Sequence, residues 1–311
     1  MQHCFKNKAG GFTMRKTKRQ SGMVIHPTMG GRIADGIIYL YLAFIAVVSL
    51  LPMWHVLMSS LSDGFSLLSY KGVAVVPVGK ITLDGYRLIF RDSSVWIGYM
   101  NTLFYVVGAV AVGFVLNVMG GYALSQHTKA RGIIMGFLFL PMLFSGGLIP
   151  TYMVMDTLGL VGNRLVIILL EATQTMFIII AGKAFSSVPQ STIEAARMDG
   201  AGHLTVMFRI MFPQCKGLFF VTILNTFIGS WNSWLNASIY MAGDKKKWPI
   251  QLFINELTSA NENFLETANP NYSRYLVQFS VIVVAILPIM IALPFFQDKI
   301  ESGVLQGGVK E

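Results

Sequence analysis

Charged side chains are scarce in this sequence of 311 residues. Asp, Glu, Lys and Arg together make up 13% of the chain, about half the fraction usual in soluble domains, whereas 54% of the residues are hydrophobic. Such a composition excludes an ordinary soluble domain as the main body of the protein, because too little charge is present to cover a solvated surface. The chain is therefore predicted to lie mostly in a membrane.

Residues that bind metals or form disulfides are also few. The chain has two cysteines, Cys4 and Cys215, and five histidines that are scattered without the spacing of metal ligands. Both cysteines fall in segments expected at the cytoplasmic side, where disulfides are rare. We therefore expect no metal site, and the cysteines predict no disulfide.

The sequence lacks the groups that would make it an enzyme. Gly182 and Lys183 are followed by alanine and lack the upstream glycine of a P-loop, so ATP hydrolysis by this chain is not expected. A membrane-embedded enzyme would need clustered catalytic groups within its apolar segments, and the single acid Glu171 is too few. The composition leaves transport as the main class of function.

Long apolar runs are what the sequence has in abundance. They do not alternate as barrel strands do, and several exceed the roughly 20 residues that cross a bilayer as a helix. The first run is too long for a cleaved signal peptide and has no small-residue cleavage pattern, so we expect a retained helix. The fold class predicted is an all-α membrane protein. Its six transmembrane helices are expected at residues 36–58, 99–124, 133–155, 165–181, 217–241 and 276–297.

Basic residues predict the orientation of the chain. Residues 1–35 form a basic arm with seven lysines and arginines against the single acid Asp35, which favours a cytoplasmic N-terminus. Six spans return the tail, residues 298–311, to the same side. The lysines at 245–247 in an outer loop argue mildly against this orientation, but the N-terminal cluster outweighs them. The net charge of +9 is thereby explained without nucleic acid as a partner.

The outer loop after the first span predicts a small extracytoplasmic cap. Residues 72–82 are rich in β-branched side chains interrupted by Pro77 and Gly79, a pattern typical of a short hairpin or edge strand. Residues 83–90 predict a short amphipathic helix that is opened by Thr82 or Asp84.

A compact polar segment, EAARMDGAGHLTVMFRIMFP at residues 194–213, lies between the fourth and fifth spans. Pro189 suits the first position of a helix, and Gly200 suits its end, because glycine adopts the left-handed conformation without a Cβ penalty. Asp199 is expected to cap a second helix over residues 203–211, which Pro213 would stop.

The surface of this segment predicts contacts with another body. Ala195, Ala196 and Ala201 allow a close approach. A common face is expected for Leu204, Phe208 and Met211, and Glu194 and Arg197 are spaced to pair. From the residues alone, a hairpin that only packs under the helix bundle is as good an interpretation as a docking surface.

The segment resembles the EAA loop of the membrane subunits of ATP-binding-cassette (ABC) importers. The resemblance is carried by Glu194, Ala195, Ala196, Asp199, Gly200, Ala201, Phe208 and Pro213. It implies a coupling loop, about residues 183–216, whose coupling helices sit in a cleft of a separate ATPase subunit. Glu194 would be the ionic anchor there, and Gly200 the turn that fits the cleft.

Four further motifs are similar to carbohydrate-type permeases of the maltose-transporter class, in particular the lipoprotein-associated oligosaccharide branch. They are SLSD (60–63), FSGGLIPTY (144–152), LGLVGNR (158–164) and WNSWLNA (231–237). The resemblance implies a multi-pass permease of the bacterial plasma membrane that imports a sugar or oligosaccharide by alternating access. A permease for a non-sugar solute is the alternative, and a channel or secondary transporter a further one.

The same resemblance implies the partners. They are a second homologous permease subunit, giving a heterodimer, two ATPase subunits and an extracytoplasmic solute-binding protein. ATP and Mg²⁺ would be bound by the partner ATPase, so this chain needs no cofactor of its own.

Two groups of residues are candidates for the substrate pathway. Glu171 is an acid at membrane depth, which is costly unless it faces the bundle interior or water. It is either an acceptor for sugar hydroxyls or a polar tie between helices, to Gln174 or to a partner subunit, and both interpretations stay open. In the fifth span, an aromatic stripe lies beside an amide stripe, which suits sugars: Trp231, Asn232, Trp234, Asn236 and Tyr240. A tryptophan belt at the outer membrane interface is the competing explanation for the tryptophans.

Overall fold

The computed structural model describes residues 29–126, 128–259 and 274–308, and every regular element in these ranges is a helix. The basic arm up to residue 28 and residues 309–311 lie outside them, as does most of the second outer loop, residues 260–273. The described part of the chain agrees with the predicted all-α fold class.

By its contacts, the chain divides into two units, residues 1–53 and 54–311. The first unit contains most of helix α1 (Met29–Ser60), an apolar helix with Pro52 inside it. This helix is long enough to cross a membrane and confirms the first predicted span.

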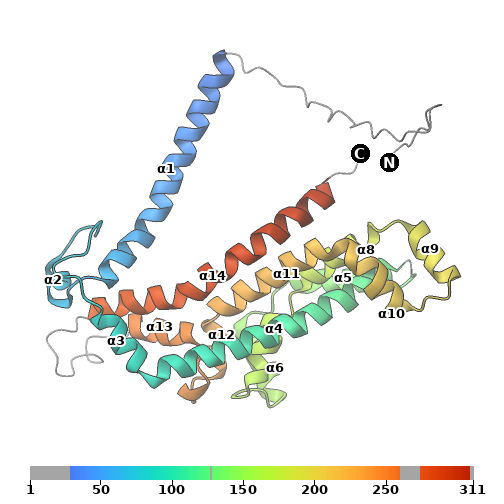
Figure 1. The fold of residues 1–311 in the computed structure, drawn as a ribbon. Helices are drawn as coiled ribbons and strands as arrows, with labels where there is room; N and C mark the ends of the chain where they lie inside the picture. Colours follow the sequence, from blue (N-terminus) through green and yellow to red (C-terminus); the bar gives the residue numbers. More distant parts are fainter. Residues whose placement is uncertain (1–28, 127, 260–273, 309–311) are drawn as a thin grey trace, which may run out of the picture. The chain divides into compact units, whose positions relative to one another are not determined.

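Three further helices of the second unit are long and apolar enough to cross a membrane. They are α4 (Ser93–Ser125), the continuous helical run His203–Asn232, whose last part is α11 (Phe212–Asn232), and α14 (Arg274–Gly308). Helix α4 packs against α11 and against two shorter helices, α7 (Arg164–Ala172) and α8 (Thr175–Ser186), while α11 packs against α14 (Figure 1). The predicted second and sixth spans are thereby confirmed as continuous helices.

Small residues let α4 approach α8 closely. A Cβ atom added to Gly121 would lie 2.6 Å from the Cβ of Ala181, and one added to Gly182 would lie 2.8 Å from the Cβ of Leu124. In a bilayer such approach matters, because helix association there relies on close packing and interhelical hydrogen bonds rather than on the hydrophobic effect.

The third and fourth predicted spans are not single helices. The third divides into α5 (Arg131–Leu143) and α6 (Leu148–Thr157), which are bent by 118°. At this break Gly147 adopts φ +82°, a conformation that glycine reaches without strain. The fourth divides into α7 and α8, which are bent by 44°. The prediction counted apolar length and missed these breaks, so six spans result if each bent pair is one span.

The fifth predicted span, residues 217–241, is broken as well. Helix α11 ends at Asn232, Ser233 is extended with φ −73° and ψ 112°, and α12 covers Leu235–Tyr240. A continuous helix was expected because the whole run is apolar. At the break the Ser233 hydroxyl donates to the Glu171 side chain on another helix, a contact that the apolar length of the run does not reveal.

Residues 61–92 contain helices α2 (Gly64–Ser69) and α3 (Asp84–Arg91). The helix expected at 83–90 is confirmed within one residue, but no strand occurs at 72–82, so that prediction was wrong. The backbone of this loop bonds both side chains and single backbone groups of residues 55–63: Ala74 N–H donates to His55 Nδ1, Val78 N–H to Ser62 Oγ, and the Val78 carbonyl accepts from Asp63 N–H. Thr82 likewise donates its hydroxyl to the Ser62 carbonyl and does not cap α3.

After α12 the chain forms a short 3₁₀ turn, η2 (Lys245–Lys247), and helix α13 (Ile250–Ser259). The turn is fixed to α4 by two side chains: Asn101 Nδ2 donates to the Lys246 carbonyl at 2.7 Å, and the Tyr105 hydroxyl to the Lys247 carbonyl at 2.7 Å. The lysine run therefore has a defined place beside α4.

Asp63 caps α2, and its loss should loosen this helix. Its carboxylate accepts from the Ser66 amide at 3.0 Å and from the Ser66 hydroxyl at 2.9 Å, and these bonds, the amide first, hold its pKa below the usual value. We predict that Asp63→Ala raises amide hydrogen exchange in α2 about fivefold, because a lost N-cap costs about 1 kcal/mol.

Asp84→Ala is the matched control, since Asp84 makes no cap bond. Because the folded-state pKa of Asp63 is depressed, the cap is present at neutral pH and is lost as the pH falls through that pKa. Unchanged exchange in Asp63→Ala relative to wild type at the same pH would contradict the capping role.

Candidate functional site

The segment with the EAA motif forms a helical hairpin, residues 190–211, at one end of the second unit (Figure 1). It consists of α9 (Gln190–Met198), α10 (His203–Thr205) and a π-helical segment, η1 (Val206–Met211). The expected turn at Gly200 is confirmed, with φ +81°, and the Ala201 N–H closes the end of α9 on the Ala196 carbonyl at 3.0 Å. Pro189 precedes the first helical residue by one position.

Two predictions about the second helix of the hairpin were wrong. Asp199 does not cap it, because the helix begins only at His203 and the cap position is occupied by Gly202. Pro213 does not stop it either, since one helical run extends from His203 to Asn232. Pro213 lies in the first turn of α11, directly after the π segment, where the change of hydrogen-bond register accommodates a residue without an N–H.

The π segment also changes which side chains share a face. Met211 is buried at 1% exposure, whereas Leu204 and Phe208 are exposed at 69% and 50%. The expected common face of these three residues was therefore wrong, because the spacing argument assumed an α-helix. Val206 and Met207 are instead the residues buried with Met211.

The alanines of the motif divide between two roles. Ala196 and Ala201 pack against the buried cluster that contains Phe185, Phe219 and Met211. Ala195 is exposed, together with Glu194 and Met198. Part of the small-residue surface thus fixes the hairpin to the bundle, and the rest stays accessible.

Two polar contacts tie the hairpin to the end of α4. Arg197 donates to Gln126 Oε1 at 3.1 Å, and the Tyr122 hydroxyl and His203 Nδ1 lie 2.7 Å apart. Arg197 therefore does not form the expected pair with Glu194. A cavity of about 300 Å³ lies behind these contacts, between α8, α9 and the end of α4. The hairpin is a firmly attached body with an exposed outer face.

Glu171 joins two helix breaks. Its Oε1 accepts from Ser233 Oγ at 2.5 Å and from Asn236 Nδ2 at 2.8 Å, so α7 is linked to both sides of the break between α11 and α12. Gln174 Nε2 donates to the Glu171 backbone carbonyl at 3.2 Å, at the break between α7 and α8. The geometry favours the polar tie, although its main partners are Ser233 and Asn236 and not the Gln174 side chain proposed from the sequence.

The predicted aromatic and amide stripes are not continuous surfaces. Trp231 is 1% exposed and donates its indole N–H to the Ala285 carbonyl at 3.1 Å, and Tyr240 stacks on Tyr152 with centroids 5.6 Å apart. Asn232 and Trp234 are exposed, beside the helix break. The break rotates the second half of each stripe, so these side chains do not form one sugar-binding face.

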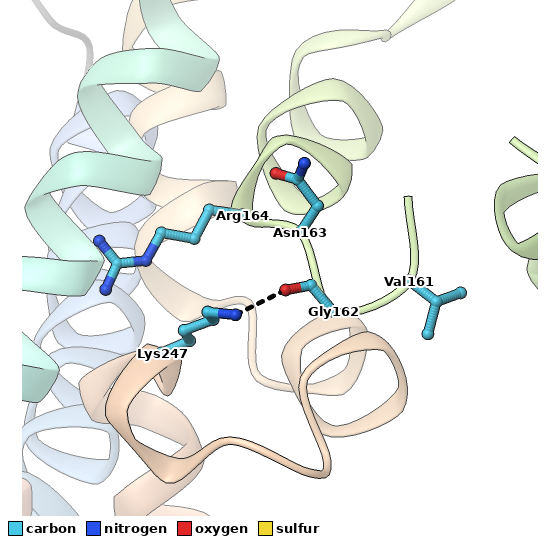
Figure 2. Close-up of a pocket in the computed structure, with 5 residues that line it drawn as sticks. All are labelled: Val161, Gly162, Asn163, Arg164 and Lys247. Carbon is cyan, nitrogen blue, oxygen red and sulfur yellow. Dashed lines mark hydrogen bonds between the residues drawn. The ribbon is translucent and has the colours of Figure 1, made fainter. Parts of the chain in front are cut away.

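Sequence reasoning missed one cavity of about 440 Å³ near the start of α7 (Figure 2). It is lined by Val161, Gly162, Asn163, Arg164 and Lys247. The available signal was the arginine that closes the LGLVGNR motif at the edge of a predicted span. Within the described residues, no cluster of His, Cys, Asp or Glu side chains could hold a metal ion.

Comparisons with known proteins identify relatives along most of the chain. The family model described as "Binding-protein-dependent transport system inner membrane component" matches residues 21–306. Protein LplC of Bacillus subtilis is 30% identical, over 92% of this chain and 98% of its own length. The polygalacturonan/rhamnogalacturonan transport system permease protein YtcP of the same organism is 29% identical, over 91% of this chain and 100% of its own.

A solved structure is similar as well. A chain of a bacterial ABC transporter involved in the import of the acidic polysaccharide alginate matches with a TM-score of 0.80 and 29% identity, covering 87% of this chain and 98% of that chain.

The tie at Glu171 should contribute measurably to stability. We predict that Glu171→Ala lowers the free energy of unfolding by about 2 kcal/mol, because Ser233 and Asn236 lose their acceptor while partly buried. Thermal unfolding of the detergent-solubilised protein measures the change. Glu171→Gln is the control, since its amide oxygen still accepts, and it should lose less. Wild-type stability in Glu171→Ala would show that the carboxylate does not hold the two breaks together.

Proposed function

Because the chain belongs to the family of inner membrane components of binding-protein-dependent transport systems, we propose that it is the permease subunit of an ABC importer for a sugar or oligosaccharide. The chain is the membrane-spanning, non-catalytic part of such a system. In the second unit, its three long apolar helices and two bent helix pairs are the elements that would form the pathway.

The cargo is proposed from the relatives. The similar permeases are named for the transport of polygalacturonan and rhamnogalacturonan, of arabinooligosaccharides and of maltodextrin. The solved transporter takes part in the import of alginate. A polymeric or oligomeric sugar is the class common to these names, which favours it over the non-sugar solute that the EAA loop alone leaves open.

The proposed coupling to ATP hydrolysis rests on the hairpin at residues 190–211. Its outer face combines an acid, Glu194, with the exposed apolar side chains of Met198, Leu204 and Phe208. Exposed apolar groups beside a charge are typical of a protein interface. We infer that a separate ATPase subunit binds this face and supplies the ATP and Mg²⁺. A channel or a secondary transporter would have no use for such a face.

The hairpin is suited to act as a lever. It is attached to α4 through Arg197 and His203 and continues without interruption into α11. Movement of the ATPase subunits would therefore be passed to α11, and from there to its break at Ser233. Such a device switches a helix bundle between two packings, which alternating access requires.

The remaining partners follow from the same proposal. A second homologous permease subunit would complete the pathway, a second ATPase subunit would serve it, and a solute-binding protein would deliver the cargo at the outer face. The hairpin would then face the cytoplasm of a bacterium, with both chain termini on that side of the plasma membrane. The loop that carries α2 and α3 would form a small cap on the outer face.

Reversing the charge at Glu194 tests the coupling. We predict that Glu194→Lys lowers ATP-dependent uptake at least tenfold while membrane insertion stays intact, because a cation would replace the acid at the ATPase interface. Uptake into proteoliposomes that contain the assembled importer measures the effect. Lys129→Glu is the control, a charge reversal at an exposed residue outside the hairpin. Undiminished uptake with Glu194→Lys would contradict an ATP-driven importer coupled through this hairpin.

A further inference from the structure

The cavity at the start of α7 carries positive charge that the proposed coupling does not use. Two of the five residues that line it, Arg164 and Lys247, are cationic, and none is acidic (Figure 2). Its volume is about 440 Å³, and it is an open hollow rather than an enclosed one. Arg164 belongs to α7 and Lys247 to the turn η2, so the cavity lies where two separate segments meet.

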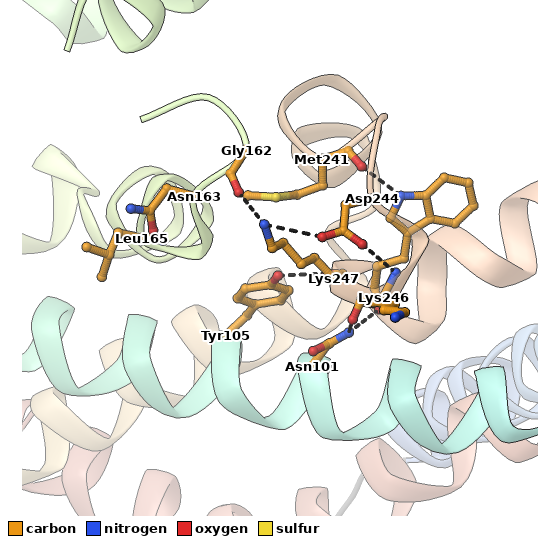
Figure 3. Close-up of polar contacts among 10 residues, drawn as sticks. Asn101, Tyr105, Gly162, Asn163, Leu165, Met241, Asp244, Lys246 and Lys247 are labelled. Carbon is orange, nitrogen blue, oxygen red and sulfur yellow. Dashed lines mark hydrogen bonds and ion pairs between the residues drawn. The ribbon is translucent and has the colours of Figure 1, made fainter. Parts of the chain in front are cut away.

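The charge of Lys247 is already neutralised. Its Nζ donates to the Gly162 carbonyl at 2.8 Å and pairs with Asp244 Oδ2 at 3.3 Å (Figure 3). The pKa of Asp244 is lowered, first by its hydrogen bond with Lys247, so the acid stays ionised at neutral pH. Lys247 therefore acts mainly as a brace between η2 and the loop that precedes α7.

The charge of Arg164 is not neutralised. Among the described residues, none forms a hydrogen bond or ion pair with its guanidinium. The contact that it makes is with the ring of Phe104, whose centroid lies 5.7 Å from Cζ. A guanidinium stacked on an aromatic ring keeps its fork of N–H groups free, and this fork matches the two oxygens of a carboxylate. The neighbouring Asn163 uses its Oδ1 to cap α7, which leaves its amide N–H groups for a ligand.

Arg164 is also aligned with the polar cluster deeper in the bundle. It is seven residues before Glu171, so both lie on nearly the same face of α7, roughly 10 Å apart along the helix axis. The residues between them on that face, Ile167 and Ile168, are apolar and buried, so Arg164 is the polar group of α7 that lines the cavity.

We propose that this cavity binds the carboxylate of an acidic saccharide, a uronic-acid unit, with Arg164 as the group that pairs with it. The proposal rests on the function proposed above and narrows its cargo to acidic sugars. The carboxylate is oriented toward Arg164, and the sugar hydroxyls toward the amide of Asn163.

The test uses two trisaccharides that differ only in charge. Trigalacturonate and α-1,4-galactotriose have the same linkages, and the second has hydroxymethyl groups in place of the carboxylates. Binding of each is measured by calorimetry to the permease–ATPase complex in nanodiscs, without the solute-binding protein, so that the affinity of that protein does not contribute. We expect the wild-type complex to bind trigalacturonate about tenfold more tightly or better.

Two variants of Arg164 and one control complete the design. Arg164→Gln should remove the preference for trigalacturonate, and Arg164→Lys should retain part of it, because lysine keeps the charge but not the fork. Arg87→Gln removes a cation on α3 that is paired with Asp84, away from the cavity, and should leave both affinities unchanged. ATPase activity of each complex shows that the variants are assembled.

Several outcomes would overturn the proposal. Equal affinity of the wild-type complex for the two sugars is one, and an unchanged preference in Arg164→Gln is another. If Arg164→Gln changes only the response to phosphatidylglycerol in the nanodiscs, the guanidinium binds a lipid headgroup instead. If the complex still takes up neutral sugars with ATP in any of these cases, only the acidic-sugar site is contradicted and the importer function is supported. If it takes up none of the tested sugars with ATP, the importer function itself is contradicted.

Discussion

The bundle depends on how it satisfies the polar groups that its broken helices leave inside a membrane. Each break frees backbone groups that have no water to bond in the hydrocarbon region, so neighbouring side chains must bond them or hold the broken ends in place. Glu171 meets this need at the centre of the bundle. Its carboxylate accepts hydrogen bonds from Ser233 and Asn236, which lie on the two sides of the break between α11 and α12. Its backbone carbonyl accepts a hydrogen bond from the Gln174 side chain at the break between α7 and α8. Without such ties, breaks between α7 and α8 and between α11 and α12 would be unstable in lipid.

The same arrangement connects the hairpin with the cavity at Arg164. The hairpin at residues 190–211 continues into α11, which ends at the break beside Glu171. The break leads through α12 to the turn η2, which braces the loop before α7 through Lys247. A shift of the hairpin therefore has a physical route to the cavity at Arg164, through elements that are joined by covalent continuity and hydrogen bonds.

Much of the architecture could be predicted from the sequence, because long apolar runs and the glycine at position 200 act locally. The runs at 36–58, 99–124 and 276–297 are helices, and Gly200 is a left-handed turn. The failures have different causes. The break at Gly147 is local, since this glycine adopts a positive φ, and counting apolar length overlooked it. The break at Ser233 and the loop at 72–82 involve contacts with residues distant in the sequence, and the π segment before Pro213 is a change of helical register. Periodicity within one segment contains no information about either.

The candidate site shows the same division between local and distant information. The EAA motif could be recognised because its residues lie close together in the sequence, at 194–213, but which of its alanines face the bundle could not, since that depends on Phe185 and Phe219 of other helices. The cavity at Arg164 escaped notice because its second cation, Lys247, is 83 positions away in the sequence. Arg164 and Lys247 differ in function only through their partners: Asp244 neutralises one, and an aromatic ring supports the other. The role of a charged side chain in this bundle therefore depends on its counterion, and the proposed recognition of an acidic sugar rests on the cation for which the described residues supply none.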